Sequence, residues 1–282
     1  MSDSDGFDVR SLAITLRRGT DIRDHTHRWG QLVFASAGSL RVSTENASWL
    51  IPPSCAIWVP GGFAHRISVP AEDAALRTLY VAPERARPFP LEPVVIEVIP
   101  LLRELILHVV DLGMLAEGRT LHDHLATLLV DLCLQARRES VRLPLPADPR
   151  ARRLAEHLQA GPADERPLTE LAAAVGASLR TLQRCFARET GLSLEAWRLR
   201  ARLIHGASRL SAGTSVTAAA IDCGYRSVTA FGAAFRREFG VTPGQYAGRA
   251  GHGTGPHPKA TKLGAPAATC RAEASTDPAA SR

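Results

Sequence analysis

A twelve-residue element occurs twice in this sequence, with an offset of 49 residues between equivalent positions. The first copy is FARETGLSLEAW, residues 186–197, and the second is FRREFGVTPGQY, residues 235–246. Phenylalanine, arginine, glutamate and glycine recur at matching places, and Trp197 is matched by Tyr246. A chain that repeats an element in register is expected to build the same local structure twice.

The first copy completes a pattern of two helices joined by a tight turn. The run LTELAAAV predicts a short helix that begins near Leu168, and Gly176 supplies the turn after it. Ser178 is a suitable N-cap for a second helix, on which Leu182 and Phe186 face inward at helical spacing. This pattern is typical of a helix-turn-helix unit.

The second copy repeats that pattern. Gly224 marks its turn, Ser227 caps its second helix, and Phe231 and Phe235 take the inward positions. Two patterns in register are a much stronger signal than one alone. The predicted units span residues 168–189 and 216–239, with a long helix from about residue 194 to 210 between them.

Charge is distributed unevenly along the 282 residues. Residues 1–146 carry a net charge of −2, residues 147–249 carry +6, and the remaining residues carry +2. Arginine supplies all of the formal positive charge in residues 147–249, and its planar guanidinium suits phosphates and guanine edges. The repeat-containing part is therefore a candidate for binding nucleic acid, with a solvated arginine-rich face as the alternative.

The first half of the chain has a different pattern. Short strand-like runs between residues 10 and 82 are broken by glycines and prolines, which predicts a small barrel or sandwich. Helical periodicity follows, and then the proline-rich ESVRLPLPADPR indicates a linker. We expect an α+β chain made of a β-barrel domain at 1–90, a helical linker segment at 91–147, an all-α domain with the two helix-turn-helix units at 148–249, and a disordered tail at 250–282.

Residues 148–247 resemble the DNA-binding domain of the AraC/XylS family of bacterial transcription regulators. The resemblance rests on LAAAVGASLRTLQRCFARETGLS, RLRARLIHGASRLSAG and AAIDCGYRSVTAFGAAFRREFGVTPGQY. It implies a domain of seven helices whose two recognition helices enter successive major-groove segments on one face of DNA. It also accounts for the repeat, because each copy supplies one recognition helix.

The side chains expected to contact DNA lie on the outward faces of these two helices. On the first helix, long arginine and glutamine side chains can reach base edges. The equivalent positions of the second helix hold Thr229, Gly232 and Ala233, where family members often carry longer polar residues, and this departure favours phosphate contacts there. The candidate DNA-binding residues are Arg180, Thr181, Gln183, Arg184, Arg188, Arg226, Ser227, Thr229, Arg236 and Arg237.

The runs HTHRWGQLVFASAG, residues 25–38, and AIWVPGGFAHRI, residues 56–67, resemble a cupin, the sensor domain of many AraC-type regulators. Cupins that hold metal use a His-x-His pair, a nearby carboxylate and a later histidine. His25, His27 and His65 match, whereas Gln31 occupies the place of the carboxylate and lacks its charge. The four residues are therefore candidates to hold a divalent metal, or to line an effector pocket or the barrel mouth without one.

The helical segment carries a leucine stripe. Leu121, Leu125, Leu128 and Leu132 are spaced by four, three and four residues, so they share one helix face. That face packs on its own domain or meets a partner chain. Helices after the cupin commonly dimerise in the resembling family, and a homodimer is favoured here.

These observations predict a sequence-specific transcription regulator that responds to a small-molecule effector, not an enzyme. Its expected partners are double-stranded DNA, a second copy of the chain and, as a further candidate, RNA polymerase. No apolar run approaches membrane-spanning length, and five scattered cysteines suit a reducing cytoplasm. The alternatives are a metal-dependent cupin enzyme tethered to DNA and a non-specific architectural DNA binder. The sequence leaves activator and repressor roles equally open.

Overall fold

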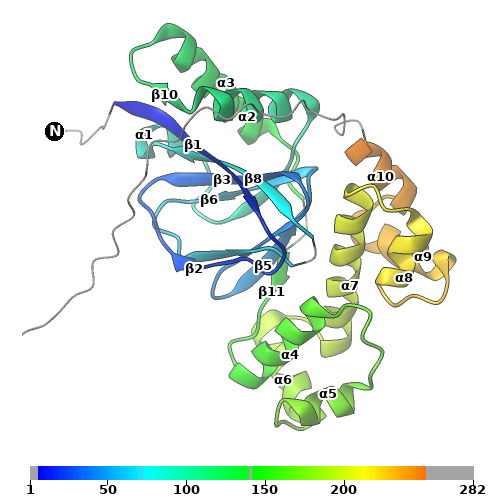
Figure 1. Ribbon diagram of the computed structural model, residues 1–282. Coiled ribbons are helices and arrows are strands. Elements are labelled where there is room, and N and C mark those ends of the chain that lie inside the picture. The colour runs from blue at the N-terminus through cyan, green and yellow to red at the C-terminus, as the bar shows by residue number, and fades with distance from the viewer. Residues whose placement is uncertain (1–5, 71, 140–141, 252–282) are drawn as a thin grey trace, which may run out of the picture.

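The computed structural model describes residues 6–70, 72–139 and 142–251, with side chains through residue 248. A β-rich N-terminal domain is followed by a helical domain (Figure 1). The strands are β1 Phe7–Leu16, β2 Asp21–His25, β3 Gly30–Ala37, β4 Leu40–Ser43, β5 Ala47–Ile51, β6 Cys55–Val59, β7 His65–Ser68, β8 Ala74–Val81, β9 Val94–Glu97, β10 Met114–Ala116 and β11 Arg142–Pro144. The helices are α1 Pro83–Ala86, α2 Pro100–Leu112, α3 Thr120–Gln135, α4 Pro149–Ala160, α5 Leu168–Ala174, α6 Leu179–Thr190, α7 Leu194–Ser211, α8 Val216–Asp222, α9 Val228–Phe239 and α10 Pro243–Gly251.

The strands form two antiparallel sheets. The six-stranded sheet has the order β10-β1-β8-β3-β6-β9, and the five-stranded sheet has the order β11-β5-β4-β7-β2. The predicted small cupin-like barrel or sandwich is therefore confirmed, and of these two forms the domain takes the sandwich, a cupin-like jelly roll of two sheets. Alternation of buried and exposed residues is the same in both architectures, so the sequence pattern could not distinguish them.

Three strands come from the segment predicted to be a helical linker. β9 pairs with β6, β10 pairs with β1, and β11 pairs with β5. Each has only three or four residues, too few for a period of two to stand out in the sequence. In the chain, strands of the sandwich therefore precede α2, separate α2 from α3 and follow α3.

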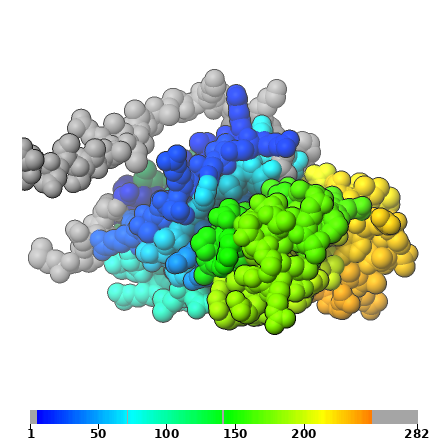
Figure 2. Space-filling view, turned by 90° about the horizontal axis from the view of Figure 1, so that it is seen from below, coloured from blue at the N-terminus to red at the C-terminus, as the bar shows by residue number. Residues whose placement is uncertain are grey.

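Buried apolar side chains form two clusters. One cluster lies between the outer face of the six-stranded sheet and helices α2 and α3, with Phe34, Trp58 and Leu129 among its members. A second fills the space between the sheets and continues into the helical domain. There α7 packs against β5 and β11, and Trp197 Nε1 donates a hydrogen bond to the Pro144 carbonyl over 2.6 Å. The helical domain consequently sits against one side of the sheet domain (Figure 2).

Seven helices, α4 to α10, make up the helical domain within residues 142–251, as the family resemblance implied. The long α7 contacts α4, α6, α8, α9 and α10 and joins the two helix-turn-helix units. The predicted disordered tail lies outside the described residues, apart from the end of α10. Among the described residues, no helix combines the length and apolar character needed to cross a bilayer.

Candidate functional site

The first helix-turn-helix unit consists of α5 and α6. Ser178 caps α6 by accepting a hydrogen bond from the Thr181 amide over 3.1 Å, as predicted. Arg180 and Arg184 are exposed, and neither forms an ion pair within the part of the chain that the structure describes. Gln183 is half-buried, because its Nε2 donates to Glu195 Oε1 of α7 over 3.1 Å. The two arginines are therefore the freest long side chains on this helix.

The second unit consists of α8 and α9. Ser227 caps α9 through a 3.4 Å hydrogen bond from the Ala230 amide. Thr229 and Ala233 are exposed, and the space around Gly232 is open, with no atom within 4 Å of where a Cβ would lie. The exposed side chains on this face of α9 are therefore short, and only those near the start of the helix are polar. The backbone of α9 can consequently approach a binding partner closely.

Arginines flank both recognition helices. Arg188 at the end of α6 forms an ion pair with Glu189 over 2.6 Å. Arg236 and Arg237 at the end of α9 are exposed and form no ion pair among the described residues. Arg226 before α9 approaches Glu165 only to 3.8 Å, with 91% of its side chain exposed. Each unit thus has two arginines without an ion pair among the described residues, and in the second unit these two lie at the end of the recognition helix.

The loop between α4 and α5 connects the two units. Arg202 of α7 donates hydrogen bonds to the carbonyls of Pro162 and Asp164, each over 2.8 Å. The Cα of Ala163 lies 3.3 Å from the position that a Cβ would take at Gly224, in the turn of the second unit. One loop therefore contacts the shared helix and the far unit together, which fixes the two recognition helices relative to each other.

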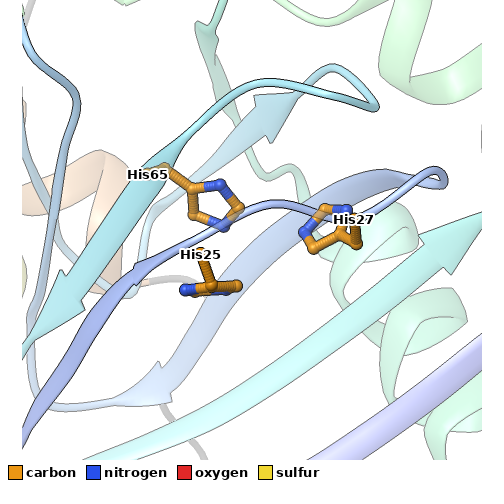
Figure 3. Close-up of side chains that lie close together, drawn as sticks. All are labelled: His25, His27 and His65. Carbon is orange, nitrogen blue, oxygen red and sulfur yellow. The ribbon is translucent and has the colours of Figure 1, made fainter. Parts of the chain in front are cut away.

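The predicted sensor residues meet where the two sheets face each other. His25 ends β2 and pairs with His65 at the start of β7, while Gln31 lies on β3 of the other sheet. The imidazoles of His25, His27 and His65 cluster together (Figure 3), and one ring nitrogen from each lies within 4.8 Å of the others. The structure brings together all four residues that the sequence predicted for this site.

Hydrogen bonds fix the orientation of each ring. The Nδ1 atoms of His25, His27 and His65 lie 2.9, 2.6 and 2.9 Å from backbone carbonyls. A carbonyl only accepts, so each Nδ1 carries the proton in the neutral ring and each Nε2 keeps its lone pair. Burial lowers the pKa of His65 to about 4, so this ring is neutral at pH 7.

Gln31 brings a fourth lone-pair atom to the same place. Its Oε1 lies 3.0 Å from Nε2 of His27 and 2.9 Å from Nε2 of His65. Its Nε2 donates to Thr78 Oγ1 over 2.9 Å, which turns the oxygen toward the histidines. With the Nδ1 atoms protonated, no proton lies between these close acceptors, and a cation among them would relieve their repulsion. The donor set therefore fits a divalent metal.

Two residues of this centre were not predicted. Thr78 orients Gln31, and the Tyr80 ring meets the His27 ring edge-on with centroids 5.2 Å apart. Both lie on β8, where Tyr80 is opposite Gln31 and Thr78 is opposite Val33 of β3. Only the register of this strand pair places them there, and no local motif marks them.

Comparisons with known proteins identify a ligand-binding domain and a helix-turn-helix domain in this chain. Residues 11–145 match the AraC-like ligand binding domain, and residues 171–249 match a helix-turn-helix domain. The chain is 34% identical over 242 residues to the HTH-type transcriptional regulator NimR of Escherichia coli (strain K12). The matched region covers 85% of this chain and 88% of NimR. It is also 39% identical over 135 residues to the HTH-type transcriptional regulator RipA of Corynebacterium glutamicum. That matched region covers 48% of this chain and 40% of RipA. Among solved structures, ToxT of Vibrio cholerae matches 86% of this chain and 98% of its own with 10% identity and a TM-score of 0.37.

Proposed function

The chain belongs to the AraC family of helix-turn-helix transcriptional regulators, and we propose that it reads an operator mainly through α6 and holds it through α9. Exposed, unpaired Arg180 and Arg184 carry this proposal, because arginine forms bidentate hydrogen bonds with guanine in the major groove. Unpaired Arg236 and Arg237 support phosphate contacts at the second unit.

Operator selection tests this function. Fragments of the source genome are selected with the full chain, and the affinity of the selected site is measured for Arg180→Ala with Arg184→Ala and for the control Arg87→Ala. Arg87 is exposed on the ligand-binding domain, far from the recognition helices in sequence. We expect a loss of site preference in the double variant alone. Unchanged preference there, or equal loss in the control, would contradict the proposal.

The three-histidine centre is the proposed effector site. His25, His27, His65 and Gln31 would hold a divalent metal, which would supply a positive centre able to bind an oxygen of an effector. Backbone carbonyls orient the three rings, burial keeps His65 neutral, and the contact of His65 with Gln31 joins β7 to β3. Metal analysis of the purified chain, and its unfolding temperature with and without a chelator, test this. A chelator effect that persists in His65→Ala would place the metal elsewhere.

A homodimer is proposed through α3. Leu121 and Leu128 are 63% and 41% exposed, whereas His122, Ala126 and Leu129 of the same helix are buried against the ligand-binding domain. Leu125 and Leu132 of the predicted stripe pack against the core of their own domain, so Leu121 and Leu128 are the stripe residues left to meet a second chain. Leu121→Asp with Leu128→Asp should give a monomer by sedimentation. A dimer that survives both changes would rule out this interface.

A cytoplasmic location and contact with RNA polymerase complete the proposal, as expected for a regulator that acts on promoters. The relatives are transcriptional regulators, and no enzymatic activity is proposed. A metal-dependent turnover by the purified chain would instead favour the tethered cupin enzyme. Equal affinity for all DNA sequences would favour an architectural binder.

A further inference from the structure

A cluster of hydrogen-bond donors lies where the helical domain meets the five-stranded sheet. Arg41 projects from β4, Gln159 from the last turn of α4 and His205 from the middle of α7. All three line one cavity of about 20 Å³, together with Ser48 and apolar residues of both domains. A cavity of that size holds about one water molecule or one small ion.

Arg41 lacks a counter-charge. One of its guanidinium N–H groups donates to the Gln159 carbonyl over 3.2 Å, and within the described residues it forms no ion pair. Its desolvation is large enough to lower the pKa of this guanidinium to about 10. A cation that is partly withdrawn from water and has no ion pair carries an uncompensated desolvation cost.

The amide nitrogen of Gln159 and the ring of His205 also lack hydrogen-bond partners among the described residues. The Gln159 Nε2 is buried and makes no hydrogen bond, while its Oε1 accepts a 3.4 Å hydrogen bond from Ser48. The His205 imidazole makes no hydrogen bond to any residue that the structure describes, and burial lowers its pKa to about 4. Unmet donors around a half-buried cation match the needs of an anion better than those of a water molecule.

We propose that Arg41, Gln159 and His205 form a binding site for one compact anionic group between the ligand-binding and DNA-binding domains. Two sources fit this chemistry. The group is either a free inorganic anion such as chloride or the carboxylate of a small molecule in the adjoining groove. That groove has a volume of about 690 Å³, lies between the five-stranded sheet and α4, and shares Arg41 and Gln159 with the cavity.

The site would act as a link between domains. Arg41 belongs to the ligand-binding domain, whereas Gln159 and His205 belong to the helical domain, so all three meet the anion only when the domains are docked. An anion bound there therefore stabilises the docked arrangement by mass action. This role is separate from the three-histidine centre, which lies between the two sheets.

Unfolding temperatures of the full chain test the site. They are measured in a series of sodium chloride and a series of sodium acetate concentrations, for the natural chain, Arg41→Met and Gln159→Glu. We expect the natural chain to gain about 3–6 °C for each tenfold rise in anion above its Kd. Arg41→Met should lose this dependence. Gln159→Glu places a carboxylate beside Arg41, so it should be more stable than the natural chain without anion and insensitive to added anion.

The matched control is Arg66→Met. Arg66 lines the outer groove, is exposed and pairs with Asp21, so its loss should leave the anion dependence intact. A response to chloride assigns the site to a free ion, and a response to acetate alone assigns it to an organic carboxylate. Parallel responses in the natural chain, Arg41→Met and Gln159→Glu would overturn the proposal, as would a Gln159→Glu chain that is less stable without anion.

Discussion

The two helix-turn-helix units use the same backbone devices. α6 and α9 each have twelve residues, each begins at a serine N-cap, and each ends at a glycine with φ 73°. Gly176 and Gly224 make the preceding turns at φ 74° and 73°. Only glycine adopts this left-handed conformation without strain, so these positions fix where each helix stops and turns.

The two units differ in their buried side chains and in their solvent-facing side chains. Phe186 of α6 packs against one aromatic ring, Trp197, whereas Phe235 of α9 packs against Phe231, Phe239 and Tyr246. On the solvent-facing side, α6 carries long side chains and α9 carries small ones. Caps and glycines therefore specify the repeated framework, while the core and the outward-facing surface differ between the two copies.

The largest expected effect concerns the two cores. Phe186→Ala and Phe235→Ala each remove a fully buried ring and should lower the free energy of unfolding by about 3–5 kcal/mol. Phe235→Ala should lie at the upper end, because it loses three ring contacts where Phe186→Ala loses one. Urea unfolding of the full chain measures both losses. A larger loss for Phe186→Ala would show that the aromatic cluster does not set the stability of the second unit.

The next effect concerns base readout. Arg184 and Ala233 occupy equivalent positions of α6 and α9. Arg184→Ala should weaken operator binding by about 1–3 kcal/mol and relax the preference at one or two base pairs. Ala233→Arg should create a new preference at the second half-site, because it restores a long donor at an exposed position.

Binding to a randomised operator library measures both changes. Arg87→Ala is the control for a lost surface charge away from the recognition helices. If Arg184→Ala kept its base preference while Thr229→Ala lost it, the second helix would be the principal reader.

Local signals explain why much of the helical domain could be predicted. Ser178, Ser227, Gly191 and Gly240 act within one turn of their own position, and the sequence displays them directly. The His25, His27 and His65 cluster was predicted for a related reason, since the cupin resemblance depends on short runs around each histidine.

Long-range contacts explain what could not be predicted. The choice between a barrel and a sandwich stayed open because sheet edges do not appear in strand periodicity. Thr78 reaches Gln31 only through the register of β8 with β3. Gln183 is held by Glu195, twelve residues away on another helix, and the Arg41 cavity exists only after two domains dock.

The smallest expected effect concerns phosphate contacts at the ends of the recognition helices. Arg188 and Arg237 are equivalent in the repeat, as are Glu189 and Glu238. Arg188 pairs with Glu189, which also accepts hydrogen bonds from the Ala147 and Asp148 amides at the start of α4. Glu238 instead pairs with Arg200 of α7 over 3.3 Å, which leaves Arg237 without a carboxylate among the described residues.

Arg237→Ala should therefore weaken binding to all DNA sequences about equally, by roughly fivefold at 0.1 M salt, and lower the log–log salt slope by about one. Arg188→Ala should change the slope by less, because its guanidinium is already partly neutralised by Glu189.

The measurement is affinity for the operator and for an unrelated duplex at several salt concentrations. Arg188→Ala with Glu189→Gln provides a second comparison, since it removes the pair as a whole. A slope that falls equally in Arg188→Ala and Arg237→Ala would mean that ion pairing at Glu189 does not distinguish the two units. A loss confined to the operator would make Arg237 a reader of sequence.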